Sequence, residues 1–96
     1  MDTKEAQDLM RRIYLERDRA RGILLTLERT LEELEELNEA ITKEKDRDSV
    51  EEEVADVFAW LCSVANLLDI DLSDALLKKY RGACSRCEKV PCECEQ

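Results

Sequence analysis

Apolar residues recur at helical spacing in two neighbouring stretches of the chain, about residues 22–44 and 49–68. The inward positions of the first stretch are Leu24, Leu27, Leu31, Leu34, Leu37 and Ile41. Those of the second are Val54, Val57, Leu61, Val64 and Leu68. This period indicates two amphipathic helices, the second starting at a capping box that opens with Ser49. The polar segment between them predicts a turn, which makes the two helices antiparallel neighbours.

Two further helices are expected, one on each side of this pair. The first is expected to be capped by Thr3, and Gly22 separates it from the next. The pattern leaves open whether these two are one bent helix. The fourth helix is expected to be capped by Asp71 or Ser73, with Gly82 as the residue just beyond its end. Four helices joined by short loops predict an all-α, four-helix bundle-like fold.

Composition supports one small helical domain, expected at residues 1–82, followed by a short irregular tail at 83–96. The chain has 96 residues, of which 41% are charged, with only two glycines and one proline. So small a domain has little interior, and its third helix is apolar on more than one side, which predicts a homodimer or homotetramer. The net charge of −9 argues against nucleic-acid binding. Without a long apolar run or an apolar leader, we expect a cytoplasmic protein with no membrane span.

Two pairs of carboxylates lie in the two central helices. Glu33 and Glu36 are three residues apart in one helix, and Glu53 and Asp56 are three apart in the other. Residues at this spacing share one face of an α-helix. The numbers of facing residues in an antiparallel hairpin have a constant sum, and Glu33 with Asp56 has the same sum as Glu36 with Glu53. The four carboxylates are therefore expected to face one another in two rungs.

A cation between these rungs would explain why like charges converge. Each of the four acids directly precedes a position of the apolar stripe on its helix, so the two pairs flank the stripes on the same side. Carboxylates brought together in this way repel one another unless a cation lies between them. Oxygen ligands select a hard ion, of which Mg²⁺ and Mn²⁺ are the main candidates. The alternative is an ordinary solvated face, which is common in so charged a chain.

Three segments resemble the MazG-like nucleotide pyrophosphohydrolase family. Residues 31–41, LEELEELNEAI, resemble its EE-x-G-E-L helix, and residues 52–57, EEVADV, resemble its E-E-L-x-D-V helix. The run ANLLDIDL at 65–72, followed by ALLKKY at 75–80, resembles the segment that follows them in the family. The likeness covers most of residues 14–80, and the two acidic motifs at this separation are more specific together than alone.

This resemblance implies an all-α fold and Mg²⁺-dependent cleavage of a nucleoside triphosphate to a monophosphate and pyrophosphate. It implies that the metal ligands are Glu33, Glu36, Glu53 and Asp56. Glu32 and Glu52 are implied as helpers, because some members use an extra acid beside these pairs. Lys79 falls where the family often has a lysine that contacts phosphate. Trp60 falls where members can place an aromatic ring near the nucleotide.

The chain departs from the family pattern at two positions, and several functions stay open. Glu35 stands where the family usually has glycine, and Ala83 stands where several members have asparagine. Relatives act on dUTP, dCTP, mixed triphosphates or phosphoribosyl-ATP, and the resemblance does not choose among them. A phosphoribosyl-ATP pyrophosphohydrolase is therefore one alternative. The other is a non-catalytic helical module that binds a partner through its leucines and its cysteine-rich tail.

The chemistry of the reaction calls for groups of these kinds. Hydrolysis at an α-phosphorus needs charge neutralisation, a positioned water and a stabilised leaving group. A carboxylate that is not saturated by metal can orient or deprotonate that water, and Glu33 or Glu36 is the expected catalytic residue. Lys79 and Trp60 are the expected substrate-binding residues. Their alternatives are an ordinary surface lysine and a ring packed in the core.

Four cysteines lie close together near the C-terminal end. Cys84-x-x-Cys87 followed by Cys92-x-Cys94 is typical of thiolates that bind structural zinc in a protein of the cytosol. The spacer between the two pairs is short, so a self-contained site would be tight. Disulfides, or a cluster completed across a subunit interface, are the alternatives. Cys62 is separate from these and is expected to be a small buried residue of the third helix.

Overall fold

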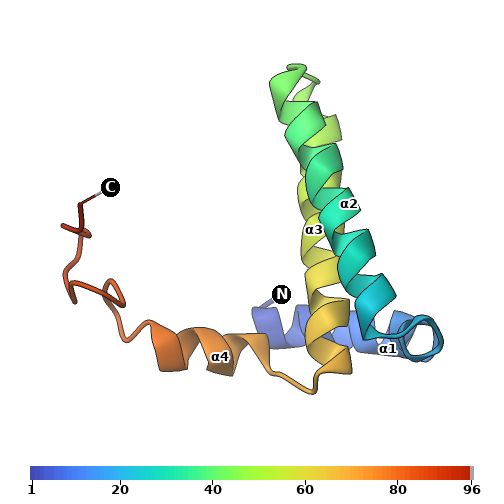
Figure 1. Cartoon of the computed structure of the whole chain (residues 1–96), viewed down its shortest axis with the longest axis horizontal. Helices are drawn as coiled ribbons and strands as arrows, with labels where there is room; N and C mark the ends of the chain where they lie inside the picture. Colours follow the sequence, from blue (N-terminus) through green and yellow to red (C-terminus); the bar gives the residue numbers. More distant parts are fainter. Residues whose placement is uncertain (96) are drawn as a thin grey trace.

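The computed structural model describes residues 1–95, which form four α-helices and no strand, so the all-α fold class is confirmed. The helices are α1 (Thr3–Arg21), α2 (Ile23–Thr42), α3 (Arg47–Leu67) and α4 (Leu72–Lys79). α2 and α3 lie side by side as a hairpin that forms one arm (Figure 1). α1 crosses the base of this arm, and α4 leads away from it toward the irregular C-terminal tail (Figure 1).

A glycine settles whether the first two helices are one. Gly22 has φ 87°, in the region that side chains with a Cβ rarely adopt, so the helical geometry stops there. Its N–H still donates to the carbonyl of Asp18 at 2.8 Å, which closes the last turn of α1. α2 then starts in a new direction at Ile23. The chain therefore has two separate helices where the sequence pattern left the question open.

The N-terminal caps of α1 and α3 differ from the predicted ones. α1 is capped by Asp2 instead of Thr3, in a capping box whose partner is Glu5; the Asp2 carboxylate accepts from the Glu5 N–H at 2.8 Å. α3 starts before the predicted box at Ser49, because the carboxylate of Asp46 accepts from the Ser49 N–H at 2.8 Å. In both places an aspartate earlier in the chain is the stronger cap, since its charge also favours the helix N-terminus.

The short helix α4 is capped as expected at its start but not at its end. The Asp71 carboxylate accepts from the Asp74 N–H at 2.9 Å, which confirms Asp71 as the cap. The prediction for Gly82 was wrong, because α4 ends at Lys79 and its C-cap is Tyr80. Gly82 has φ 80° but lies beyond the position that follows the cap, in the tail.

Buried amides join α1 to the end of α3. The Gln7 side chain donates to the Asn66 side-chain oxygen at 3.0 Å and to the Ile70 carbonyl at 2.6 Å. It accepts in return from the Leu72 N–H at 3.0 Å, at the start of α4. The Asn66 amide donates to the Gln7 carbonyl at 3.2 Å. Because buried amides need partners with fixed directions, this network sets where α1, α3 and α4 meet.

The apolar core of the single chain is very small. Among the described residues, the fully buried apolar ones are Ala40, Cys62 and Ala65, so the prediction that Cys62 is buried is confirmed. The leucine stripe of α2, predicted to face inward, is largely exposed in the single chain. The large apolar side chains exposed on α2 and α3 are Leu24, Leu25, Leu27, Leu31, Leu34, Ile41, Val54, Phe58 and Leu61. Of the predicted stripe only Leu37 is half-buried. The inward prediction failed for the rest because α2 packs mainly against α3, which covers only part of its apolar surface.

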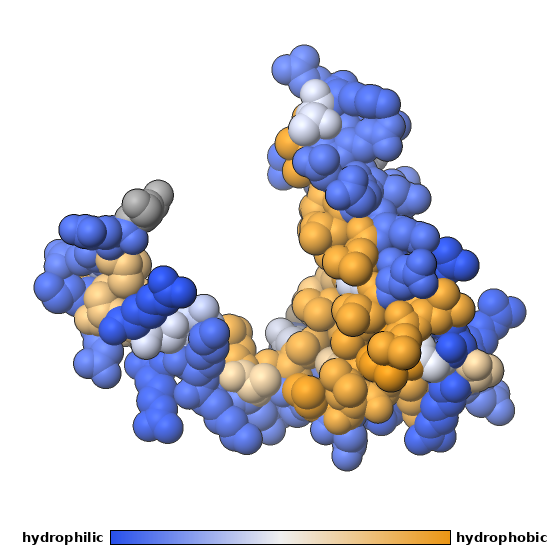
Figure 2. Space-filling model, in the orientation of Figure 1, coloured by the Kyte–Doolittle hydropathy of each residue, from blue (hydrophilic) through white to orange (hydrophobic). Residues whose placement is uncertain are grey.

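On the face shown in Figure 2, apolar side chains cover the lower part of the arm and its base. None of the helices that the structure describes is long and apolar enough to span a membrane. Removing a leucine of this face from water is worth about 1.5–3 kcal/mol, so several together would dominate the stability of so small a chain. This face is therefore the feature that favours association with a further apolar surface.

We predict that the chain self-associates through this face, as a dimer or a tetramer. Light scattering at micromolar concentration should give a multiple of the 11.2 kDa chain mass. Leu31, which is 59% exposed, is the position to test: Leu31→Lys should shift the mass toward the monomer by placing charge in an apolar contact. Asn38→Lys is the matched control, because it adds the same charge at an exposed polar position of the same helix. A monomeric wild-type protein would contradict the prediction.

Candidate active site

Three carboxylates converge where α2 and α3 pair. Glu33 from α2 and Glu53 and Asp56 from α3 each have an oxygen within 4.8 Å of those of the other two. The spacing of three residues keeps Glu53 and Asp56 on one side of α3, and the antiparallel hairpin turns Glu33 toward them. The acids of the two helices therefore meet as the sequence predicted from their positions.

Two oxygens of this cluster are buried without a hydrogen-bond partner. They are Oε2 of Glu33 and Oε2 of Glu53, one from each helix. A buried carboxylate oxygen that accepts nothing loses its hydration without compensation, at a cost of a few kcal/mol. Such orphaned oxygens fit a site whose remaining partner is a bound cation.

The fourth acid, Glu36, lies beside the other three and, like Asp56, is exposed. Burial raises the pKa of Glu33 to about 7, and the next contributions come from Glu36, Asp56 and Glu53. Burial also raises the pKa of Glu53, with Glu36 and Asp56 adding to it. All four acids thus act on one another, and two of them hold their protons more tightly than an ordinary glutamate.

The donor set fits a hard divalent cation. Every candidate ligand atom is a carboxylate oxygen, and the cluster combines buried oxygens with others that solvent reaches. Mg²⁺ and Mn²⁺ take oxygen ligands and keep some of their water, so they need a site that is only partly enclosed. The residues Glu33, Glu36, Glu53 and Asp56 therefore fit the ion that the resemblance implies.

The two acids expected as helpers differ in their surroundings. Glu32 lies on the exposed side of α2, where Arg29 donates to it at 2.8 Å, and it is not part of the cluster. Glu52 lines a polar hollow of about 330 Å³ at the end of the hairpin, together with Glu36 and Glu53. The hollow gives Glu52 a position near the cluster that Glu32 lacks.

A second cavity adjoins the acid cluster and shares one residue with it. Its volume is about 140 Å³, and Asp56 lines it. The other lining residues are Tyr14, Asp18, Arg21, Ala59, Trp60 and Ser63. Because one carboxylate belongs to both, a ligand in this cavity would reach the cation site without leaving the surface of α3. Trp60 lies here, so the structure brings this expected substrate-binding residue close to the acids.

Ionic and aromatic contacts form the wall of this cavity. The Arg21 guanidinium lies 4.7 Å from the centroid of the Trp60 ring, and it donates to Asp18 at 2.9 Å and to Thr26 at 3.2 Å. Asp18 is only 1% exposed, and its second oxygen has no hydrogen-bond partner. The cation on the ring face and the buried ion pair hold Trp60 in a fixed position.

Sequence reasoning missed the contribution of α1 to this cavity. Tyr14, Asp18 and Arg21 lie in a helix whose apolar and basic residues suggested only packing. The sequence signal for this role was weak. Asp18 is a single aspartate among arginines at the end of α1, and its spacing alone does not predict that it is buried. Their role depends on how α1 crosses α3, which the pattern of either helix cannot give.

Lys45 is a further residue that the sequence did not single out. It lines the polar hollow with Glu52 and Glu53, in the turn between α2 and α3. Its charge lowers the pKa of Glu53, against the larger effects of burial and of neighbouring carboxylates. A basic residue in the turn between two acid pairs is the signal that could have identified it.

The other residues noted from the sequence lie away from the acids. Lys79 is exposed at the end of α4, with its ammonium 5.9 Å from the Tyr80 ring, and it lines neither the cavity nor the hollow. Glu35 is exposed on α2, and Ala83 lies in the tail. A single chain therefore does not bring Lys79 to the acid cluster.

The chain matches a known protein family. Residues 21–90 match the model of the MazG nucleotide pyrophosphohydrolase domain. This range includes both acid pairs and Trp60 but leaves out nearly all of α1. A comparison with curated proteins gives no match.

We predict that the cation-free protein loses stability as the pH rises from about 4.5 to about 7. The pKa of Glu33 rises from 4.5 to about 7 on folding, so the folded state binds more protons than the unfolded state between these values. The free energy of unfolding must then fall with pH in that window, because deprotonation restores the repulsion among the acids. Thermal melts followed by circular dichroism measure it.

Mg²⁺ should raise the melting temperature more at about pH 8 than at about pH 5, since only the ionised cluster binds it well. Glu33→Gln is the matched variant, and it should flatten both the pH dependence and the effect of Mg²⁺. A melting temperature that ignores Mg²⁺ at both pH values would mean that the cluster does not bind the ion.

Proposed function

The chain belongs to the MazG nucleotide pyrophosphohydrolase family, and from this premise we propose that it cleaves a nucleoside triphosphate to a monophosphate and pyrophosphate with Mg²⁺. The observation that carries the proposal is Asp56. It belongs both to the carboxylate cluster and to the cavity that Trp60 lines. A cation site and an aromatic cavity that share a wall suit a substrate with a polyphosphate at one end and a base at the other.

Glu33, Glu36, Glu53 and Asp56 would hold Mg²⁺ or Mn²⁺. When bound, such an ion neutralises phosphate charge and makes a water molecule more acidic. The protein has nine more formal negative than positive charges, so its own surface would otherwise repel a polyphosphate. The carboxylates would hold the positively charged ion between α2 and α3, at the place where the substrate is to be cleaved.

Glu36 is the better of the two expected candidates for accepting the proton of the attacking water. Glu33, Glu53 and Asp56 converge on one another, whereas Glu36 lies beside this group of three. A carboxylate that is not used up by a cation keeps an oxygen free to orient a water and take its proton. Glu36 would therefore act as the general base, while Glu33, with its buried Oε2, serves as a ligand.

The base of the nucleotide would lie in the cavity against Trp60. An aromatic face stacks on any base at about 1–3 kcal/mol, and Arg21 on the Trp60 ring keeps that face in place. Lys79 would contact the outer phosphates only where a second copy of the chain brings α4 to this site. This part of the proposal thus joins substrate binding to self-association.

The direct test is a screen for pyrophosphate release. A panel of ribo- and deoxyribonucleoside triphosphates and phosphoribosyl-ATP is incubated with the full chain and Mg²⁺ or Mn²⁺. We expect pyrophosphate and a monophosphate in equal amounts from at least one triphosphate, and none without the divalent ion. Activity on phosphoribosyl-ATP alone would identify the substrate alternative. No release from any compound with either ion would leave the chain as a non-catalytic binding module.

We predict that Glu36→Gln and Asp56→Asn each lower kcat by about a hundredfold or more, because each removes a carboxylate that the reaction uses. Neither should lower the melting temperature of the cation-free protein, since each takes one charge from a repelling cluster. Glu35→Gln, at an exposed neighbouring position of α2, is the matched control and should keep its activity. A clear drop in melting temperature without metal would instead give these acids a structural role.

A further inference from the structure

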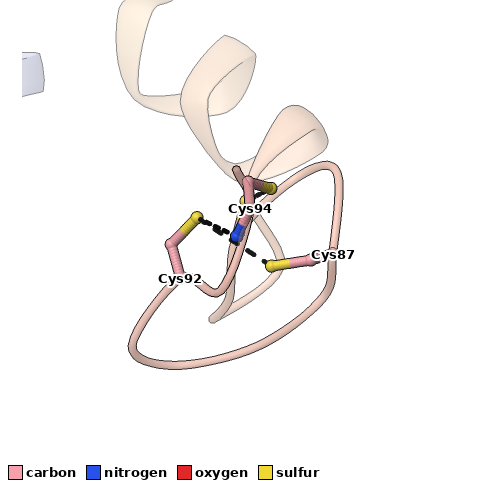
Figure 3. A group of neighbouring side chains, drawn as sticks. Cys87, Cys92 and Cys94 are labelled. Carbon is pink, nitrogen blue, oxygen red and sulfur yellow. Dashed lines mark hydrogen bonds between the residues drawn. The ribbon is translucent and has the colours of Figure 1, made fainter. Parts of the chain in front are cut away.

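The four cysteines after α4 form a compact cluster in the tail. Every sulfur lies within 4.8 Å of the other three. The sulfurs of Cys84 and Cys94 are 3.7 Å apart, and those of Cys87 and Cys92 are 3.9 Å apart. Four thiolates in a tetrahedron around Zn²⁺, each at about 2.3 Å, have sulfurs about 3.8 Å from one another. Figure 3 shows three of these side chains, Cys87, Cys92 and Cys94, directed toward a common centre.

The backbone of the tail is folded to hold these sulfurs. The Cys84 N–H donates to the Lys89 carbonyl at 3.2 Å, and the Glu88 N–H donates to the Cys84 carbonyl at 2.9 Å. Glu88 has φ 61°, which makes the tight turn after the first cysteine pair. The turn brings the two halves of the motif together across their short spacer, so the spacing that made a self-contained site look tight is accommodated.

Backbone N–H groups point at three of the four sulfurs. Arg86 donates to Cys84 at 3.5 Å, Glu93 donates to Cys87 at 3.4 Å and Cys94 donates to Cys92 at 3.3 Å. N–H donors favour the thiolate over the thiol, and the backbone N–H groups of Cys87 and Arg86 hold the pKa of the Cys84 thiol at about 6. The same kind of contact lowers the pKa of the Cys87 thiol. The neighbouring sulfurs, Cys92 first, raise the pKa of Cys94 to about 11.

We propose that Cys84, Cys87, Cys92 and Cys94 bind one Zn²⁺ as a closed structural site. Zinc prefers soft sulfur ligands in a tetrahedral set, and the sequence has no histidine to replace one of them. None of the four is joined in a disulfide. Four protein ligands leave no open position for water, so this site orders the tail and takes no part in hydrolysis.

The tail has little else to hold it in shape. Its one large aliphatic residue, Val90, is 74% exposed, and no residue from 80 to 95 is fully buried. A segment without an apolar core needs a cross-link or a metal to keep one conformation. Zinc would supply that constraint and fix the direction in which the chain continues from α4.

The zinc site and the carboxylate site are separate in space and in chemistry. The tail lies beyond the far end of α4, away from the arm formed by α2 and α3 (Figure 1). One site offers only sulfur and the other only oxygen, so Zn²⁺ and Mg²⁺ should sort between them by ligand type. Metal loss from the tail and metal loss from the acids are therefore distinguishable events.

Elemental analysis of the full chain, purified without added metal, is the first test. We expect about one Zn²⁺ per chain, and Cys87→Ser should lower this to near zero because a site with three thiolates binds more weakly. Cys62→Ala is the matched control: Cys62 lies buried in α3, so its removal should leave the zinc content unchanged. Glu36→Gln should leave it unchanged too, which shows that the zinc is not held by the acids.

A second measurement follows the tail itself. Removing zinc with a strong chelator should make the segment after α4 much more sensitive to limited proteolysis, while the helical circular dichroism of residues 3–79 persists. Substitution with Co²⁺ should give sulfur-to-metal charge-transfer absorption, which Cys87→Ser abolishes. Less than about half an equivalent of zinc together with two titratable disulfides would overturn the proposal, as would full zinc content in Cys87→Ser. Both results are independent of whether the chain hydrolyses nucleotides.

Discussion

The pairing of α2 with α3 brings the carboxylates of the two helices together, and the stability of the hairpin depends on this convergence of charge. Acids of both helices meet where α2 and α3 pair, although the buried apolar residues of these two helices are only Ala40, Cys62 and Ala65. Among the described residues this convergence is only weakly compensated: Lys45 lowers the pKa of Glu53 against larger opposing effects, and two carboxylate oxygens have no hydrogen-bond partner. The hairpin is therefore less stable than its packing alone would make it until a cation binds.

A charged and weakly packed hairpin needs support from elsewhere, and α1 supplies it through polar contacts. Gln7 and Asn66 bond each other at the foot of α3, and Arg21 joins Asp18 to the ring of Trp60 further along. Apolar surfaces can slide over one another, but hydrogen bonds and ion pairs between buried groups fix an orientation. The crossing of α1 is thus tied to the same contacts that form the cavity. This explains why charged residues, Asp18 and Arg21, line the cavity beside the Trp60 ring.

The sequence predicted those features that depend on one helix or on one hairpin. The meeting of Glu33 with Glu53 and Asp56 followed from spacing and antiparallel direction alone, both of which are local. The caps at Asp2 and Asp46 were missed because an aspartate and a hydroxyl residue compete for the same position, and only the folded backbone decides between them. The exposed leucines of α2 show another limit. A stripe of apolar residues says that a surface will be covered, but not by which chain.

The cavity could not be predicted from patterns because its lining comes from two helices that are far apart in sequence. Asp18 looks like any helical acid until α1 crosses α3 and buries it. The same reasoning explains why the cysteine cluster and the carboxylate cluster are assembled in different ways. The cysteines lie within eleven residues and can find one another through turns of their own backbone. The carboxylates need the whole α2–α3 hairpin, so they meet only when that part of the chain has folded. The cysteine site is a local structure that a bound metal would complete. The carboxylate site forms only when α2 and α3 pair, and a bound metal would reduce the repulsion among its acids.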